Sequence, residues 1–111
     1  MLTISTHILN ASLGQPAPQV LVKLFYIQAD QSTLVDQQFT NADGRIQTFQ
    51  IDQTLCGSYQ LCFEVAAYFQ ALNVDSFYPK VCIDFYVKDM EQHYHVPLLI
   101  SPFSYSTYRG S

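Results

Sequence analysis

Apolar and polar residues alternate along several short segments of the chain, which is the pattern of half-buried β-strands. In the first segment one face carries Leu2, Ile4, Thr6 and Ile8, and the opposite face carries Thr3, Ser5 and His7. We expect further strands over residues 20–27, 58–65, 80–87, 94–101 and 104–108, and a short helix over 66–72. Many short strands with at most one helix predict an all-β fold in which two sheets pack as a sandwich.

Turn-forming residues mark two connections between the expected strands. Residues 10–18 are rich in turn-forming types, and the stretch from Thr40 to Gly44 ends in Asp43-Gly44, a strong turn signal. Arg45 is the first residue beyond that turn. With 111 residues and no linker, repeat or low-complexity tract, we expect a single domain over 1–111.

Charge is sparse and slightly acidic, with a formal net charge of -4. Scattered Lys and Arg in an acidic chain argue against a nucleic-acid partner. No apolar stretch is long enough to span a bilayer, so we expect no membrane partner. The chain enters a strand pattern at Leu2 without the basic and apolar regions of a signal peptide. We therefore expect a cytoplasmic protein, unless a leader has been removed.

The cysteines are Cys56, Cys62 and Cys82. An odd count with irregular spacing argues against a disulfide framework or a zinc knuckle, and favours buried free thiols. A catalytic cysteine is the alternative, but no histidine is near Cys56 in sequence.

Strand parity places the histidines together. His93 and His95 lie opposite the apolar set Val96, Leu98 and Ile100, and His7 lies opposite the apolar face of the first strand. If these strands share a sheet, its outer face carries a polar patch that could bind a small hydrogen-bonding molecule. The simplest alternative is that each His is merely solvated. Another is a metal site on His7, His93 and His95, which we disfavour because no acidic residue stands beside them to orient the rings.

Longer motifs resemble those of the 5-hydroxyisourate hydrolases, a family that shares its fold with the hormone carrier transthyretin. The motifs are Leu2-Thr3-Ile4-Ser5-Thr6-His7-Ile8-Leu9-Asn10 with Gly14-Gln15-Pro16-Ala17, then Asp43-Gly44-Arg45-Ile46, Ser76-Phe77-Tyr78-Pro79, His93 to Pro102, and Tyr105 to Ser111. The last block is the most specific. The departures of the chain from the family are small: Phe103-Ser104, between the last two motifs, stands where an aromatic-Gly pair is common, and the cysteines are not part of the pattern.

The resemblance implies a transthyretin-like sandwich of two four-stranded sheets with one short helix, assembled as a homotetramer whose sites lie at a channel between subunits. It implies hydrolysis of 5-hydroxyisourate in urate degradation, a step of purine catabolism, without a cofactor or a catalytic metal. The catalytic residues that it implies are His7, Arg45 and His95. The implied substrate-binding residues are Tyr108, Arg109, Gly110 and Ser111, with His93 and Ser106 as supporting neighbours. The alternative is a transthyretin-like carrier that binds a small molecule without catalysis. Transthyretin lacks the His-Arg-His set and the Tyr-Arg-Gly-Ser ending that this chain carries.

Overall fold

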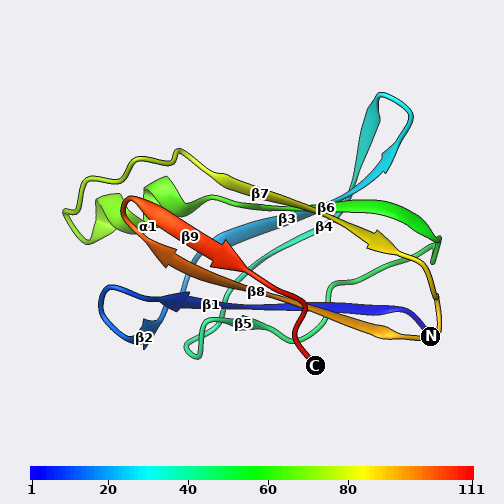
Figure 1. The fold of residues 1–111 in the computed structure, drawn as a ribbon, viewed down its shortest axis with the longest axis horizontal. Coiled ribbons are helices and arrows are strands. Elements are labelled where there is room, and N and C mark those ends of the chain that lie inside the picture. Colours follow the sequence, from blue (N-terminus) through cyan, green and yellow to red (C-terminus); the bar gives the residue numbers. More distant parts are fainter.

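The structure is a computed structural model that describes residues 1–111, and it consists of two β-sheets packed face to face with one short helix at an end (Figure 1). The first sheet has the order β2-β1-β8-β9, and β5 also pairs with β1. Its strands are β1 (Thr3–Asn10), β2 (Gln15–Pro16), β5 (Arg45–Ile46), β8 (His93–Ser101) and β9 (Ser104–Thr107). The second sheet has the order β4-β3-β6-β7, with β3 (Leu21–Gln28), β4 (Gln31–Phe39), β6 (Gly57–Phe63) and β7 (Val81–Val87). The predicted all-β sandwich is confirmed.

The helix α1 (Val65–Ala71) follows β6 directly, so the apolar residue Val65 is buried as the first helical residue and not as the last strand residue. Its seven residues are too few to cross a bilayer, and the chain has no other helix.

Strand β4 is the one long strand that the hydrophobic pattern did not predict. Its side chains are mostly exposed because it is an edge strand, and the β3–β4 hairpin projects beyond the sandwich (Figure 1). A strand with little buried surface carries no strict apolar alternation, so periodicity alone cannot find it.

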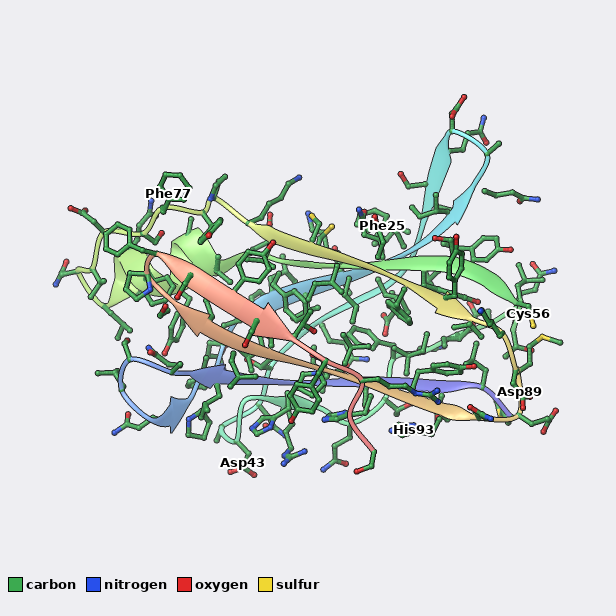
Figure 2. All side chains as sticks on the ribbon, in the orientation of Figure 1. Phe25, Asp43, Cys56, Phe77, Asp89 and His93 are labelled. Atoms are coloured by element: carbon green, nitrogen blue, oxygen red, sulfur yellow. The ribbon has the colours of Figure 1, made fainter.

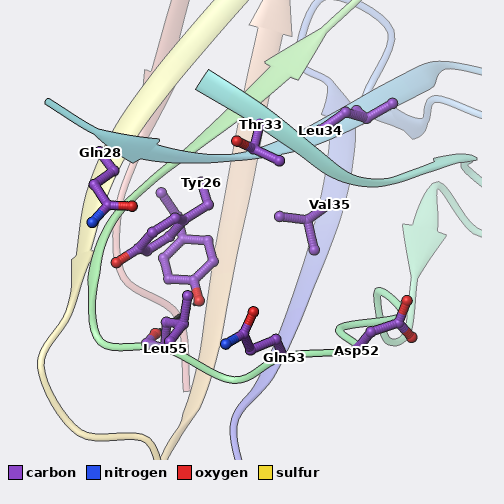
Figure 3. A pocket seen from close by; sticks show the side chains of 9 residues that line it. Tyr26, Gln28, Thr33, Leu34, Val35, Asp52, Gln53 and Leu55 are labelled. Carbon is purple, nitrogen blue, oxygen red and sulfur yellow. Dashed lines mark hydrogen bonds between the residues drawn. The ribbon is translucent and has the colours of Figure 1, made fainter. Parts of the chain in front are cut away.

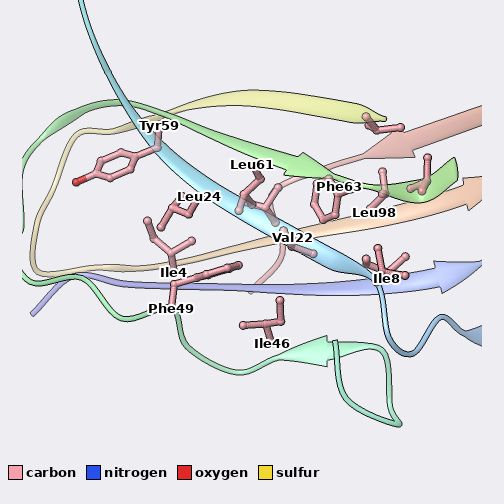
Figure 4. Packing of buried hydrophobic residues seen from close by; sticks show 14 of the residues in the cluster. Ile4, Ile8, Val22, Leu24, Ile46, Phe49, Tyr59, Leu61, Phe63 and Leu98 are labelled. Atoms are coloured by element: carbon pink, nitrogen blue, oxygen red, sulfur yellow. The ribbon is translucent and has the colours of Figure 1, made fainter. Parts of the chain in front are cut away.

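The core lies between the two sheets and is built from the inward faces that parity predicted. Ile4 and Ile8 of β1 meet Leu98 of β8 and, from the opposite sheet, Leu24 and Leu61, all without solvent exposure (Figure 4). Thr6, the polar member of this face, donates its hydroxyl proton to the carbonyl oxygen of Val96 at 2.6 Å. Its hydrogen bond removes the cost of burying a hydroxyl among apolar groups.

Strands β1 and β8 are parallel neighbours, and their register decides which outward side chains lie side by side. Thr3 is paired with His93, Ser5 with His95, and His7 with Pro97. Because side chains alternate, the polar residues of both strands gather on the face turned away from the core.

The cysteines depart in part from the expectation. All three are free, but only Cys62 is buried, whereas Cys56 and Cys82 are exposed. Cys62 and Cys82 are register partners on β6 and β7, with their Sγ atoms 2.7 Å apart. Burial, followed by the hydrogen bond with Cys82, raises the pKa of the Cys62 thiol to about 12. Both residues face outward because their positions alternate with the core residues Leu61 and Val81.

Candidate active site

A pocket of 380 Å³ opens on the outer face of the β1–β8 sheet. Its lining is almost entirely polar and consists of Ser5, Thr6, Arg45, Ile46, Gln47, His93, His95 and Ser111. Figure 2 shows His93 and Asp43 on this side of the molecule, away from the second sheet. The sheet face that parity selected therefore carries a hollow large enough for a small heterocycle.

His7 and Arg45 meet because β5 pairs with β1, which makes these two residues register partners. The preceding turn is held by the Asn41 side-chain oxygen, which accepts hydrogen bonds from the backbone N–H groups of Asp43 and Arg45. Gly44 has φ +72°, and a Cβ there would lie 2.5 Å from the carbonyl oxygen of Ile8. Only glycine permits this turn to dock so closely on β1, so the predicted Asp-Gly signal also places Arg45.

His95 is held from two sides. The Ser5 hydroxyl lies 2.6 Å from its Nδ1 atom, and the backbone N–H of Gly110 donates to its carbonyl oxygen at 2.8 Å. A Cβ on Gly110 would lie 2.5 Å from Cδ2 of the His95 ring. The φ of Gly110 is not positive, so its backbone conformation does not require glycine. The reason for glycine here is the close approach of the C-terminal segment to the imidazole.

His93 lines the same pocket and is bonded through both ring nitrogens. Its Nδ1 is 2.5 Å from Thr3 Oγ1, and its Nε2 is 3.0 Å from Ser5 Oγ. The rings of His93 and His95 lie nearly parallel with centroids 6.3 Å apart. Alternation along the first strand predicts that Thr3 and Ser5 lie on this face, but it assigns them no role. Their register with His93 and His95 is the signal that would have found them, but it requires knowing that β1 and β8 are parallel neighbours.

The electrostatics of the pocket favour neutral imidazoles. Partial burial, followed by the positive charge of Arg45, lowers the pKa of His95, and His93 and His7 act in the same direction. Burial and then Arg45 also lower the pKa of His7, against a smaller opposing effect from Asp43. A neutral imidazole has a lone pair that can take a proton, so both residues are suited to act as bases near neutral pH.

Two of the predicted substrate-binding residues, Tyr108 and Arg109, lie outside the pocket of their own chain. Strand β9 ends at Thr107, so the alternation of side chains between the two faces of the sheet stops before Tyr108. Tyr108 and Arg109 instead line a hollow beside Phe85 and Val96. The Arg109 guanidinium stacks 4.6 Å from the centre of the Tyr94 ring and donates to Gln92 Oε1 at 2.9 Å.

Of the remaining predicted residues, Ser111 lines the pocket and Ser106 does not. Ser106 pairs with Leu99 further along β8. The structure has one salt bridge, between the Met1 ammonium and Glu91, and it lies outside the pocket. The structure contains no group of three or more His, Cys, Asp or Glu side chains placed to hold a metal ion. His7, His93 and His95 therefore do not form the three-ligand arrangement that zinc would need.

A second hollow, of 340 Å³, lies beside the β3–β4 hairpin, at the end of the sandwich opposite the helix (Figures 1 and 3). It is lined by Tyr26, Gln28, Thr33, Leu34, Val35, Asp52, Gln53, Leu55 and Tyr59. The hydroxyl groups of Tyr26 and Tyr59 donate to the carbonyl oxygens of Cys56 and Leu55. This hollow contains no histidine or cationic side chain, so it lacks the acid–base groups of the first pocket.

Comparison with known proteins gives both a family and two kinds of relative. Residues 4–110 match the model of the HIUase/Transthyretin family. A probable 5-hydroxyisourate hydrolase of Caenorhabditis elegans is 44% identical over 110 residues, which cover 98% of this chain and 82% of that protein. The structure of Klebsiella pneumoniae 5-hydroxyisourate hydrolase is 40% identical with a TM-score of 0.84 over 98% of this chain and 99% of its own. Sea bream transthyretin, solved in complex with thyroxine, is 30% identical with a TM-score of 0.89 over 96% of this chain and 93% of its own.

Proposed function

The chain belongs to the HIUase/Transthyretin family, and from this we propose that it is an enzyme that hydrolyses 5-hydroxyisourate in urate degradation. The product is 2-oxo-4-hydroxy-4-carboxy-5-ureidoimidazoline. The observation that carries the proposal is a polar pocket lined by His93, His95 and Arg45. His7 is the register partner of Arg45 on β1, and burial and Arg45 lower the pKa of both His7 and His95. Relatives named as 5-hydroxyisourate hydrolases match nearly the full length of the chain, which supports the same activity here.

The backbone alone does not separate this enzyme from a carrier. The TM-score against sea bream transthyretin is 0.89 and that against the Klebsiella hydrolase is 0.84, so the fold fits both. Function belongs to the side chains of the site and not to the fold. The identity is higher to the hydrolase, 40% against 30%, and the pocket holds groups that can move protons. A carrier site needs shape and hydrogen bonds but no base.

In the proposed mechanism a neutral imidazole removes a proton from water as the water attacks a ring carbonyl of the substrate. Water is a weak nucleophile near neutral pH, and a positioned base lowers this barrier. His95 and His7 share the tasks of base and proton donor. As the carbonyl carbon becomes tetrahedral, its oxygen gains negative charge, which the Arg45 guanidinium stabilises. The C–N bond of the cyclic amide then breaks, and the leaving nitrogen takes up a proton.

Binding of the substrate uses the C-terminal segment. Ser111 lies in the pocket and offers polar atoms to the ring edges of the substrate, while Gly110 lets the segment lie against His95. Tyr108 and Arg109 are directed away from their own chain's pocket, so in this proposal they contribute through the neighbouring subunit.

We propose a homotetramer with its sites at a channel between subunits. The support is a set of exposed aromatic side chains along the edge strands and their connections, namely Phe77, Tyr86, Phe103, Tyr105 and Tyr108. Exposed apolar groups beside the unpaired edges of β7 and β9 favour association with another copy of the chain. A single catalytic domain over 1–111 would supply each subunit. Light scattering that found an active monomer would contradict this assembly.

The proposed reaction requires no metal or cofactor because side chains fill every role in it. Added zinc would act as an inhibitor by binding His93 and His95 in the pocket, which needs no preformed site of three histidines. We place the protein in the cytoplasm, since three free thiols, two of them in contact, are typical of a reducing compartment.

The test is a spectrophotometric assay in which urate oxidase generates 5-hydroxyisourate in place. The purified protein should accelerate the loss of this compound in the presence of a metal chelator. Activity that disappears with the chelator and returns with zinc would contradict the metal-free mechanism but not the substrate.

A further inference from the structure

An unbroken row of hydrogen-bonding side chains runs along the outer face of β1 and β8. It starts at Thr3, continues through the imidazole of His93 and the hydroxyl of Ser5, and ends at Nδ1 of His95. The row exists because parallel pairing puts Thr3 beside His93 and Ser5 beside His95. Ser5 is 5% exposed, so its hydroxyl is shielded from bulk water, whereas His93 at the outer end is exposed.

The chemistry of the groups restricts how protons are distributed in this row. The Ser5 hydroxyl has one proton but contacts an imidazole nitrogen on each side, so it donates to one ring and accepts from the other. If it donates to Nε2 of His93, it accepts from Nδ1–H of His95. Each neutral imidazole carries one N–H group, so Nε2 of His95 is then an unprotonated base, and no protein group bonds to that atom.

The hydrolysis itself leaves one proton to be removed. Water brings two protons to the reaction. One ends on the nitrogen released when the ring C–N bond breaks, and the new C–O bond leaves the carbonyl carbon in a carboxylic acid. A carboxyl group near its usual pKa is ionised at neutral pH, so the second proton must reach solvent.

We propose that Ser5 is a positioning residue that fixes the base form of His95, and that Ser5 and His93 relay the released proton from His95 to solvent. As Nε2 of His95 takes up the proton, Nδ1–H passes its proton to Ser5, and Ser5 passes its own to Nε2 of His93. His93 then loses a proton from Nδ1, past the Thr3 hydroxyl, at the exposed end of the row. Both rings are now in the opposite tautomer. After the product has left, Nε2 of His95 releases its proton and the row takes one back at Nδ1 of His93, which restores the base. This inference rests on the proposed hydrolysis and assigns a task to residues outside the catalytic set.

The surroundings of His95 support the direction of transfer. Burial is the largest cause of the lowered pKa of His95, and Arg45, His93 and His7 lower it further. All four disfavour the imidazolium form. A proton taken up by His95 is therefore released readily. Arg45, Ser111 and His93 line the pocket together with His95, and His93 is the exposed member of the row.

The test compares Ser5→Ala and His93→Ala with the wild type. We expect Ser5→Ala to lower kcat roughly tenfold or more with little change in KM, because a positioned proton transfer is lost while the binding groups remain. Ser5→Thr keeps the hydroxyl and should retain more activity than Ser5→Ala. Ser58→Ala is the matched control, since Ser58 lies on β6 in the other sheet and should leave kcat unchanged. His93→Ala should also lower kcat, and added imidazole should restore part of it.

Nitrogen-15 NMR of the His95 ring gives a second measurement that does not depend on activity. The wild type should show protonated Nδ1 and bare Nε2, and Ser5→Ala should show a mixture of the two tautomers. If the wild type hydrolyses the substrate while both variants keep kcat within twofold, the relay is wrong and the proposed function stands. A slow Ser5→Ala with a normal His93→Ala would also overturn the relay. If the wild type is inactive, the proposed function fails, and an unchanged His95 tautomer in Ser5→Ala would separately refute the positioning role.

Discussion

The two faces of strands β1 and β8 are built from alternating residues of the same segments, yet they serve different purposes. On the inner face Ile4, Ile8 and Leu98 have no solvent exposure and hold the two sheets together. On the outer face Ser5 and His95 lie one residue away from core positions and line a polar pocket. A shift of register by one residue would exchange the faces, so packing of the inner face also fixes the position of the outer one.

The residues that stabilise the fold and the residues that line the pocket are therefore different residues of the same strands. Removing an inner side chain leaves a cavity in a densely packed interior, which destabilises the fold. Removing an outer side chain takes a proton-transfer or charge-stabilising group from the pocket without disturbing the core. Substitutions on the inner face should therefore lower stability, and substitutions on the outer face should lower activity.

The largest difference in stability between the two faces is expected from two adjacent leucines of β8. Leu98→Ala should lower the free energy of unfolding by about 2–5 kcal/mol, because Leu98 is fully buried. Leu99→Ala, on the outer face and only half-buried, is the matched control and should cost clearly less. Urea denaturation of both variants measures the difference. Equal losses would show that the outer face contributes to stability as much as the core does.

Substitutions of catalytic residues on the outer face should lower kcat and leave stability unchanged. His95→Ala should lower kcat about a hundredfold or more, as loss of a positioned base typically does, while the free energy of unfolding stays near that of the wild type. His7→Ala and Arg45→Ala should behave alike, with Arg45 acting through the charge on the oxyanion. Steady-state kinetics paired with urea denaturation provides the check. If His7→Ala and His95→Ala both kept near-full activity, neither residue would be the base.

Gly110→Ala tests how closely the C-terminal segment must approach His95. The added Cβ would lie 2.5 Å from Cδ2 of the ring, so either the ring or the segment must move. We expect kcat to fall roughly tenfold with little change in stability, because small displacements of catalytic groups are costly and Gly110 lies outside the core. Gly14→Ala is the control for kcat: its Cβ meets open space, but φ +68° strains the backbone away from the site, so it should lower stability and leave kcat unchanged. Wild-type activity in Gly110→Ala would remove this contact from the site.

The smallest effect is a shift in pH dependence. Both imidazoles have pKa values below the usual 6.5, with burial as the first cause and Arg45 as the second. The base forms therefore persist below pH 6.5, and kcat should begin to fall only as the pH drops through the lowered pKa values. Arg45→Gln removes the second cause, so both pKa values should rise and the acidic limb should move to higher pH. NMR titration of the two rings in the wild type and in Arg45→Gln measures this directly, and a downward shift would contradict it.

Much of this architecture could be predicted from the sequence. Strict alternation in β1, β6, β7 and β8 gave the inward residues correctly because these strands bury one face in the core. Strand β4 was not predicted because an exposed edge strand has no such alternation of apolar and polar residues. The face shared by His7 and His95 followed from parity, whereas the Ser5 contacts required the parallel register of β1 and β8. Tyr108 was misplaced on that face because parity was extended past the end of β9.

The central claim is that the outer face of β1 and β8 catalyses hydrolysis of 5-hydroxyisourate. The most direct measurement is the decay of freshly generated 5-hydroxyisourate, followed spectrophotometrically with a chelator present, for the wild type and for His95→Ala. We predict that the wild type accelerates the decay and that His95→Ala, folded to the same extent, loses about a hundredfold or more of that rate. A wild type that leaves the decay at its spontaneous rate, or binds the compound without consuming it, would contradict the claim and favour a carrier.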